Sequence, residues 1–340
     1  MKEHSANYLS RAGYKQTEVG VIPESWEVSK LASFGEVIRG ASPRPKGDKR
    51  FYGGNVPRLM VEDVTRDGKI VFPQVDFLTE EGAKRSRPCK KGTLTIVCSG
   101  TVGIPSFLGV DACIHDGFLA LINLRKSVNG DYLYHQLCRL RESFDSSATH
   151  GGVFTNLTTA GVREFTVPLP PTKAEQEAIA EALSDADALI ESLEQLLAKK
   201  RQLKQAAMQE LITGKKRLPG FSGEWEMKRL GDVTDTDPEN LGSDTRPTFA
   251  FNYIALEDVD VGTLRSYSEQ LFRTAPSRAR RKLRKDDILV STVRPNLMSH
   301  LLFAFENDQW VCSTGFCVVR CREHITHSHY IYFGASVNSL

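Results

Sequence analysis

Basic residues in two clusters are the side chains of this 340-residue sequence that best fit a chemical task. The first cluster precedes the segment GTLTIVCS and comprises Lys84, Arg85, Arg87, Lys90 and Lys91. The second precedes DDILVSTV and comprises Arg278, Arg280, Arg281, Lys282, Arg284 and Lys285. Several flexible cations on one surface can bind phosphates, because each neutralised phosphate releases a condensed counterion. A single cluster is more often a solvated face, but its recurrence leads us to predict that both clusters contact phosphates.

A third basic stretch lies between positions 39 and 52, where prolines, a glycine and aromatic residues alternate with cations. Its cations are Arg39, Arg44, Lys46, Lys49 and Arg50. Such a loop can reach the bases or the backbone of a nucleic acid, and an ordinary surface loop fits the sequence about as well. We take Arg44, Lys46 and, in another polar and turn-rich segment, Arg294 as candidates for contacts with bases or a groove.

Catalytic motifs are missing from the sequence. It contains no GxSxG elbow, no Walker motif and no HExxH, and its short glycine pairs predict turns. The Asn-Pro-Pro-aromatic tetrapeptide typical of amino-methyltransferases is also absent. The pairs Glu62-Asp63 and Glu257-Asp258 are expected on strands, where adjacent side chains point to opposite faces. We interpret them as strand-end or turn positions and not as a paired acid and base. We therefore assign no catalytic residue.

Metal-ligating side chains gather near the end of the sequence, at Cys312, Cys317, Cys321, His324, His327 and His329. Their spacing matches no CxxC zinc knuckle, and the first half of the chain has no equivalent, so we assign no metal site. No signal peptide is apparent, and no apolar run is long enough to span a membrane. The seven cysteines are therefore interpreted as reduced thiols in the cytoplasm.

The totals are ordinary for a globular protein. The hydrophobic fraction is 40%, and 44 basic residues nearly balance 42 acidic ones. Because the formal net charge is only +2, an argument for nucleic-acid binding has to rest on local clusters.

The elements that must position these clusters occur twice in the sequence. The segment PESWEVSKLASFGEV, with Trp26, is matched by PGFSGEWEMKRLGDV, with Trp225. Likewise RLMVEDV at 58–64 is matched by YIALEDV at 253–259, and DGF at 116–118 by TGF at 314–316. The steady offset of 194 to 199 residues indicates a tandem duplication. Short apolar runs between Gly, Pro and charged turns predict that each copy is an α+β domain with much β-structure.

A long helix is predicted between the two copies. Apolar residues recur there at spacings of three and four, which is typical of a coiled-coil seam or an antiparallel helix pair. The seam residues are Ile179, Leu183, Ala186, Ile190, Leu193 and Leu197, and Leu211 continues the same phase. Thr172 and Glu175 suit a capping box, and Gly214 suits a helix stop. Roughly 40 residues at about 1.5 Å each make a rod of about 60 Å, which implies a spacer with a partner helix.

The order of these features resembles the specificity subunit of type I restriction-modification systems. The resemblance is carried by Gly151-Gly152, the segment FTVPLPP at 165–171, Glu175-Gln176, and the leucine-rich helix ending LITGKKRLPGF before Trp225. It implies a first target recognition domain at 1–170, a central helical spacer at 171–217 and a second, incomplete target recognition domain at 218–340. Each domain of such a subunit reads one half of a bipartite double-stranded DNA site, while helices set the spacing and dock modification subunits.

The same resemblance implies which chemistry belongs to other chains. The subunit itself is non-catalytic and holds no cofactor. Modification subunits bind S-adenosylmethionine and methylate adenine, and a restriction subunit uses ATP and Mg. We expect these subunits as partners of this chain, together with DNA, and expect no membrane.

One departure from the family pattern leaves alternatives open. The rest of the second domain and a second helix, which relatives have, do not follow Leu340. The sequence is then a fragment, an inactive truncated subunit, or a chain whose seam pairs with a second copy or with another chain. Two rival functions also stay open: a self-contained DNA methyltransferase, and a coiled-coil scaffold whose flanking domains bind protein.

Overall fold

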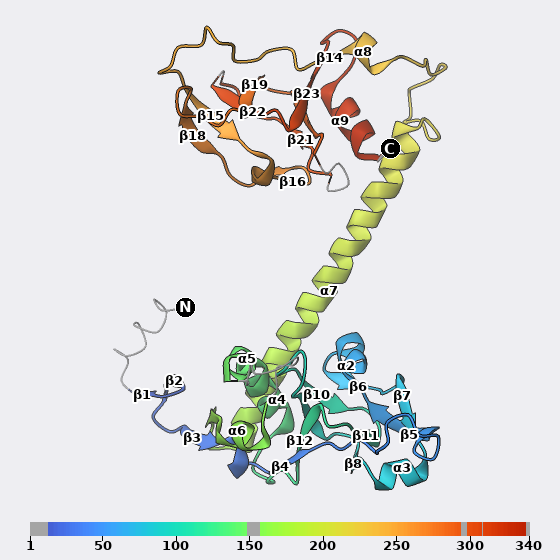
Figure 1. Ribbon diagram of the computed structural model, residues 1–340, viewed down its shortest axis with the longest axis vertical. Coiled ribbons are helices and arrows are strands. Elements are labelled where there is room, and N and C mark those ends of the chain that lie inside the picture. The colour runs from blue at the N-terminus through green and yellow to red at the C-terminus, as the bar shows by residue number, and fades with distance from the viewer. Residues whose placement is uncertain (1–12, 148–156, 294–297, 308, 338–340) are drawn as a thin grey trace. The chain divides into compact units, whose positions relative to one another are not determined.

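A computed structural model describes residues 13–147, 157–293, 298–307 and 309–337 (Figure 1). The chain divides into two compact units, residues 1–192 and 193–340. Each unit combines β-sheets with helices, and helix α7 spans Lys173–Ile212. The predicted α+β class, with two β-rich domains and a long helix between them in sequence, is confirmed. None of the described helices is long and apolar enough to cross a membrane.

Unit 1 is built on two sheets. The five-stranded sheet has the order β4-β12-β9-β10-β6, with bounds Glu36–Arg39, Phe118–Ile122, Leu94–Val97, Pro105–Leu108 and Ile70–Val71. The four-stranded sheet has the order β7-β5-β11-β8, with bounds Asp76–Leu78, Tyr52–Leu59, Ala112–Ile114 and Arg87–Cys89. All neighbouring strands run antiparallel except β10 with β6 and β11 with β5, which are parallel.

All four residues of strand β9, LTIV, are buried. Leu94 and Ile96 belong to one hydrophobic cluster, and Val97 belongs to another. Because successive side chains of a strand point to opposite faces, a strand covered on both faces is read as a continuous apolar run. Helix α4, Gly130–Arg139, adds Leu133 and Leu137 to the first of these clusters.

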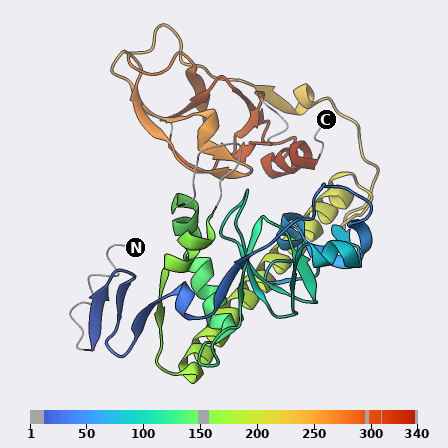
Figure 2. The ribbon, with the colours of Figure 1, turned by 60° about the horizontal axis from the view of Figure 1, so that its bottom comes forward.

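The remaining elements of unit 1 are short. They are β1 Tyr14–Thr17, β2 Gly20–Pro23, β3 Glu27–Lys30, η1 Leu31–Ser33, α2 Val61–Asp67, α3 Glu80–Lys84, α5 Arg141–Ser147, α6 Thr159–Glu164 and β13 Thr166–Leu169. Strand β3 pairs with β13, which leads the chain into α7. The β1–β2 hairpin projects from the rest of unit 1 (Figures 1 and 2). Residues 150–152, a predicted glycine turn, lie outside the described residues.

Unit 2 repeats the strand order of unit 1, except that its first sheet has no counterpart of the edge strand β6 among the described residues. One sheet has the order β14-β23-β20-β21, with bounds Thr234–Thr236, Phe316–Cys321, Ile288–Ser291 and Leu301–Leu302. The other has the order β18-β15-β22-β19, with bounds Ser268–Leu271, Ala250–Ile254, Trp310–Ser313 and Ala279–Leu283. Strands β15 and β22 run parallel, as β5 and β11 do in unit 1. The topology therefore confirms the duplication that the sequence predicts.

Short segments complete unit 2: α8 Leu230–Val233, η2 Leu256–Asp258, β16 Val259–Asp260, β17 Thr263–Leu264 and α9 Ser328–Val337. Helix α9 carries the Tyr-Ile-Tyr segment at 330–332 and α4 carries Tyr-Leu-Tyr at 132–134, so these helices are also equivalent in the two units.

The prediction that the two Glu-Asp pairs lie on strands is wrong. In unit 1 the pair lies in the first turn of α2, and in unit 2 it lies in η2. Asp63 accepts a hydrogen bond from the Met60 backbone N–H at 3.0 Å, and Asp258 accepts one from the Ala255 N–H at 2.8 Å. A carboxylate there satisfies an amide that the helix leaves unpaired, so the repeated EDV motif marks a helix start.

Helix α7 begins where predicted and is anchored to unit 1 by its first turns. The Thr172 hydroxyl accepts a hydrogen bond from the Glu175 N–H at 3.2 Å, as expected of the cap. The Glu175 carboxylate, which was expected to complete a capping box, instead accepts from the Trp26 indole N–H at 3.0 Å. The Gln176 side chain is 1% exposed; it accepts from the Asn129 N–H and donates to the carbonyls of Ser127 and Pro170. The Glu175-Gln176 dipeptide therefore attaches the start of α7 to the rest of unit 1.

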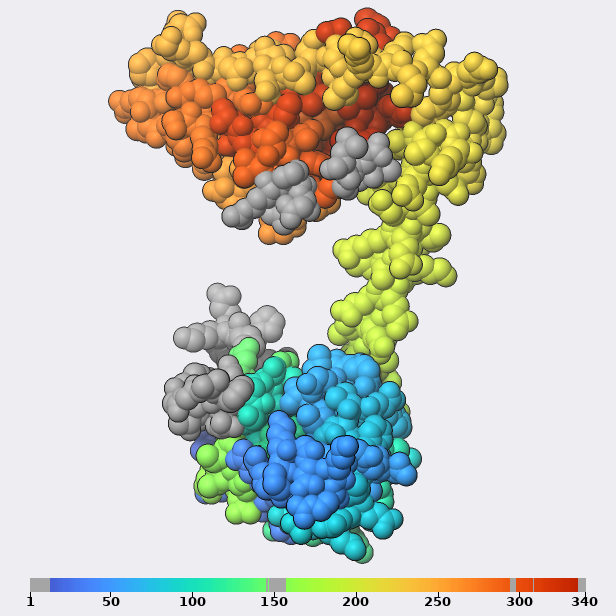
Figure 3. Space-filling model, turned by 45° about the vertical axis from the view of Figure 1, so that its right-hand side comes forward, coloured from blue at the N-terminus to red at the C-terminus, as the bar shows by residue number. Residues whose placement is uncertain are grey.

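Most of the predicted seam of α7 is exposed to solvent. Leu183, Ile190, Leu193 and Leu197 are 43 to 55% exposed, whereas Ile179 and Leu211 are half-buried. Figure 3 shows side chains standing out along the middle turns of the helix. Within the described part of the chain, the fully buried residues of α7 are Gln176 and Ala180. After Ile212 the chain leaves the helix, with Gly214 at φ +70° as the predicted stop.

Candidate nucleic-acid interface

A segment that we call strap 1, residues 39–51, connects β4 with β5 and lies against β8 and α3 of unit 1. The Ser86 hydroxyl donates a hydrogen bond to the Ala41 carbonyl at 2.6 Å. Arg87 Nε donates to the Arg39 carbonyl at 3.3 Å. The Phe51 side chain at the end of the strap is buried, and the Arg85 guanidinium lies 4.4 Å from the centre of its ring. These contacts bring the third basic stretch beside part of the first cluster.

The result is a surface that we call the cationic surface of unit 1, made of Arg39, Arg44, Lys46, Lys49, Lys84 and Arg87. Apart from Arg44, none of these side chains has a carboxylate at ion-pairing distance within the residues that the structure describes. Arg50 and Arg85 also lie here, but Asp48 and Glu81 pair with them. Exposed cations without a carboxylate partner are available to neutralise phosphates.

The first cluster is split by strand β8. Lys84, Arg85 and Arg87 lie at the end beside strap 1. Lys90 and Lys91 follow the other end, where Lys90 pairs with Asp111 at 2.8 Å. Lys91 instead lines a hollow with Lys69, Phe72 and Phe107.

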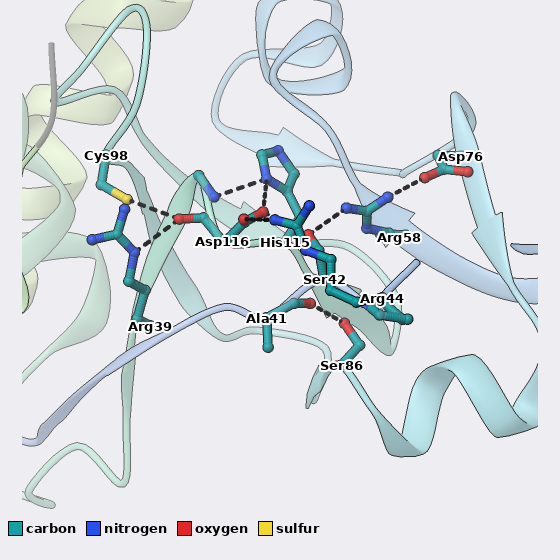
Figure 4. Close-up of polar contacts among 12 residues, drawn as sticks. Arg39, Ala41, Ser42, Arg44, Arg58, Asp76, Ser86, Cys98, His115 and Asp116 are labelled. Atoms are coloured by element: carbon teal, nitrogen blue, oxygen red, sulfur yellow. Dashed lines mark hydrogen bonds and ion pairs between the residues drawn. The ribbon is translucent and has the colours of Figure 1, made fainter. Parts of the chain in front are cut away.

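Asp116 lies at the centre of a network of polar contacts beside strap 1 (Figure 4). Its carboxylate accepts a hydrogen bond from the Ser42 hydroxyl at 2.5 Å and faces Arg44 Nη2 at 3.4 Å. Its backbone carbonyl accepts from Arg39 Nε at 2.9 Å. The buried Arg58 donates to Ser42 Oγ at 2.7 Å and pairs with Asp76. Side chains from the strap, β5 and the 115–117 turn are thus fixed together.

Gly40 explains how strap 1 can pass so close to this turn. A Cβ atom at position 40 would lie 2.0 Å from the His115 carbonyl oxygen, which is far inside van der Waals contact. Only glycine fits where the strap leaves β4, and its N–H donates to the Phe118 carbonyl at 2.9 Å.

His115 contributes no positive charge to the surface. Burial lowers its pKa, and the neighbouring Arg58 charge lowers it further. The Gly117 N–H donates to Nδ1 at 2.8 Å, so the proton of the neutral imidazole is on Nε2. Nε2 is buried and has no hydrogen-bond partner among the described residues.

Unit 2 carries acids where unit 1 carries cations. Strap 2, residues 237–249, occupies the equivalent position between β14 and β15. Strap 1 contains five basic residues and one acidic residue, whereas strap 2 contains three acidic residues and one basic residue. Its backbone runs along β19, with Leu241 N–H donating to the Arg280 carbonyl at 2.7 Å.

The acids of strap 2 neutralise much of the second basic cluster. Asp237 pairs with Arg281. Glu239 pairs with Arg284, with Lys282 at 3.5 Å and with Arg320 at 2.6 Å. Burial opposes ionisation of Glu239, but the hydrogen bond from Arg320 and the nearby positive charges lower its pKa overall.

The other members of the second cluster differ in their surroundings. Lys285 pairs with Glu306 at 2.5 Å. Arg278 and Arg280 have no described carboxylate partner, and Arg280 lies 5.0 Å from the centre of the Phe272 ring. The phosphate contacts assigned to this cluster stay a prediction, and its ion pairs weigh against Arg281, Arg284 and Lys285. Arg294 lies outside the described residues.

Sequence reasoning missed Asp116, Ser42 and Arg58. The signal that could have found Asp116 is the mismatch between DGF at 116–118 and TGF at 314–316, a polar difference within an otherwise matching turn. Ser42 and Arg58 gave no local signal, because their roles depend on contacts between distant segments.

Comparison with known proteins agrees with this architecture. Residues 23–201, more than half of the chain, match the family model described as type I restriction modification DNA specificity domain. The MjaIX specificity subunit of Methanocaldococcus jannaschii is 27% identical over 242 residues, covering 65% of this chain and 54% of that protein. The MjaVIII specificity subunit of the same organism is 27% identical over 237 residues, covering 67% and 53%. The chain therefore spans about half the length of the curated relatives it matches.

A solved structure extends the likeness in fold. The S subunit of a type I restriction-modification system from M. genitalium has a TM-score of 0.52 at 16% identity, covering 92% of this chain and 76% of that one. With the family model matching more than half of its residues, this chain belongs to the type I restriction modification DNA specificity domain family.

Proposed function

We propose that this chain is the DNA-recognition subunit of a type I restriction-modification complex, in which each unit contacts one half of a bipartite double-stranded site. The observation that carries the proposal is the duplicated fold within this family, together with the cationic surface of unit 1. Phosphate contacts by unpaired cations would hold the duplex, and polar side chains beside them would read the bases.

Helix α7 has two roles in this proposal. Its 40 residues give about 60 Å of helix, which suits a spacer between two DNA half-sites. Its exposed seam suits a partner helix, supplied by a second copy of this chain or by another chain.

The chemistry in this proposal belongs to partner subunits in the cytoplasm. Modification subunits would bind S-adenosylmethionine and methylate the DNA, and a restriction subunit would use ATP and Mg. This chain would supply sequence choice and no catalytic group.

Methylome sequencing of cells with and without the gene tests the proposal directly. We expect a bipartite methylated motif that disappears on deletion and returns with the gene. Identical methylomes in both cells, with the modification subunits expressed, would contradict a role in sequence choice.

A further inference from the structure

We propose that Asp116 and Arg44 read one G·C base pair in the major groove. Asp116 would accept a hydrogen bond from the cytosine amino group, and Arg44 would donate to guanine. In the major groove the cytosine amino group is a donor that suits an aspartate, and the guanine edge offers acceptors that suit an arginine. The inference rests on the proposed function and assigns a base position to two side chains of unit 1.

Asp116 retains capacity to accept a hydrogen bond from a ligand. An ionised carboxylate offers about four lone-pair sites. The Asp116 side chain is 51% exposed, and its carboxylate contacts Ser42 Oγ at 2.5 Å, Arg44 Nη2 at 3.4 Å and His115 Nδ1 at 3.4 Å. Because the His115 nitrogen already accepts from Gly117, it does not donate to the carboxylate. Acceptor sites of Asp116 are therefore open to solvent.

Another Arg-Asp pair in the same strap shows the contrast. Asp48 accepts from Arg50 through the backbone N–H at 2.9 Å, through Nε at 3.1 Å and through Nη2 at 2.7 Å. Its side chain is 21% exposed. Asp48 and Arg50 therefore satisfy each other through several short contacts, whereas the contact of Arg44 with Asp116 is single and 3.4 Å long. Arg44 keeps donors for guanine.

The electrostatic setting favours contact with a base over contact with the backbone. Asp116 faces Arg44 and lies beside Arg39, one of the cations that would bind phosphates. A carboxylate would repel a phosphate at this place, but it pairs well with an amino group at a base edge. The exposed acid beside Arg39 and Arg44 is thus best explained by base recognition.

The network behind Asp116 holds it in one orientation. Ser42, which donates to the carboxylate, is itself held by the buried Arg58, and Arg58 is held by Asp76. Arg39 holds the Asp116 carbonyl. Fixed geometry of this kind is what discrimination between bases requires.

The second unit presents a different group on the same scaffold. Thr314 takes the place of Asp116 before the shared Gly-Phe dipeptide, and it is exposed. Two half-sites of different sequence need different side chains at equivalent positions, so this turn is suited to carry the difference.

The test selects bound duplexes from a random DNA library, using the full 340-residue chain. The variants are Asp116→Asn and Arg44→Gln, with Asp48→Asn as the matched control. We expect a wild-type consensus with a G·C pair that both variants lose, each by about tenfold in preference at that position. Asp48→Asn should keep the consensus, and Asp116→Asn should keep the wild-type salt dependence on mixed-sequence DNA.

Three results would overturn the inference. An unchanged consensus in Asp116→Asn removes Asp116 from base reading while leaving the proposed function intact. A uniform loss at all positions, with a lower melting temperature, assigns Asp116 a purely structural role. A wild-type chain that selects no consensus contradicts the proposed function itself, and the assignment falls with it.

Discussion

Arg87 and Arg281 occupy equivalent positions in the two units, but of the two only Arg281 is paired with a carboxylate among the described residues. Arg87 lies opposite Ile114 in the β8–β11 pair, and Arg281 lies opposite Cys312 in the β19–β22 pair. Arg281 pairs with Asp237 of strap 2, whereas Arg87 is exposed and contacts the Arg39 backbone of strap 1. The positive charge of Arg281 is therefore neutralised by Asp237, whereas that of Arg87 has no carboxylate partner among the described residues.

Neutralising Lys84 and Arg87 together should weaken binding to duplex DNA of any sequence. Each lost phosphate contact should reduce the slope of log affinity against log salt by about one. Fluorescence anisotropy with a mixed-sequence duplex at several salt concentrations measures both quantities. The matched variant Arg281→Ala should keep the slope, because its charge is already neutralised. Equal losses of slope in both variants would show that the ion pair opens to DNA.

Replacing Arg320 by Ala should destabilise unit 2 by about 3 kcal/mol, because it leaves a buried carboxylate unpaired. Arg320 donates through Nε and Nη2 to Asp287, both at 2.7 Å, and Asp287 is fully buried. Hydrogen exchange of β20 and β23 under mild denaturant reports on this unit alone. Arg322→Ala is the control, since it breaks an exposed pair with Asp235 and should cost less than about 1 kcal/mol. Similar hydrogen exchange in the Arg320→Ala and Arg322→Ala variants would contradict the larger contribution of the buried Arg320–Asp287 pair to stability.

Replacing Gln176 by Leu should loosen the start of α7 from unit 1. The change leaves the Asn129 N–H and the carbonyls of Ser127 and Pro170 without their partner. Of these three residues only Pro170 is buried, and a buried group left unpaired costs about 1–3 kcal/mol. Faster hydrogen exchange in the first turns of α7 would register the loss. Glu177→Gln changes an exposed neighbour and should leave exchange there nearly unchanged. If the Gln176→Leu variant keeps the wild-type protection from hydrogen exchange, the Gln176 side-chain amide does not anchor α7.

Replacing Leu193 and Leu197 by Glu should prevent pairing of the helix seam without unfolding the chain. Both side chains are at least half exposed, so a carboxylate there is solvated in the single chain but would be buried in a helix pair. Light scattering across a wide concentration range measures the effect as loss of dimer. Lys199→Glu, which lies off the seam, is the control. A wild-type chain that stays monomeric throughout would rule out self-pairing and leave another chain as the partner.

Much of the fold could be predicted from local signals. Turn residues and apolar runs give the two matching series of strands, and the spacing of Leu and Ile gives the long helix, because these patterns act between neighbours in sequence. The EDV motif was misassigned because an acidic pair after a short apolar run fits a strand end as well as a helix start.

The sequence by itself determined the duplication, the helix between the copies and the family resemblance. Only the tertiary structure decided which cations are available to a ligand. Arg281 and Asp237 are 44 residues apart, and Arg320 and Glu239 are 81 apart, so no local pattern foretells that they neutralise each other. Asp116 likewise meets Ser42 and Arg44 across more than 70 residues. The charge of each side chain follows from its residue type. Whether that charge faces solvent or an ion-pair partner depends on strand pairing between distant segments.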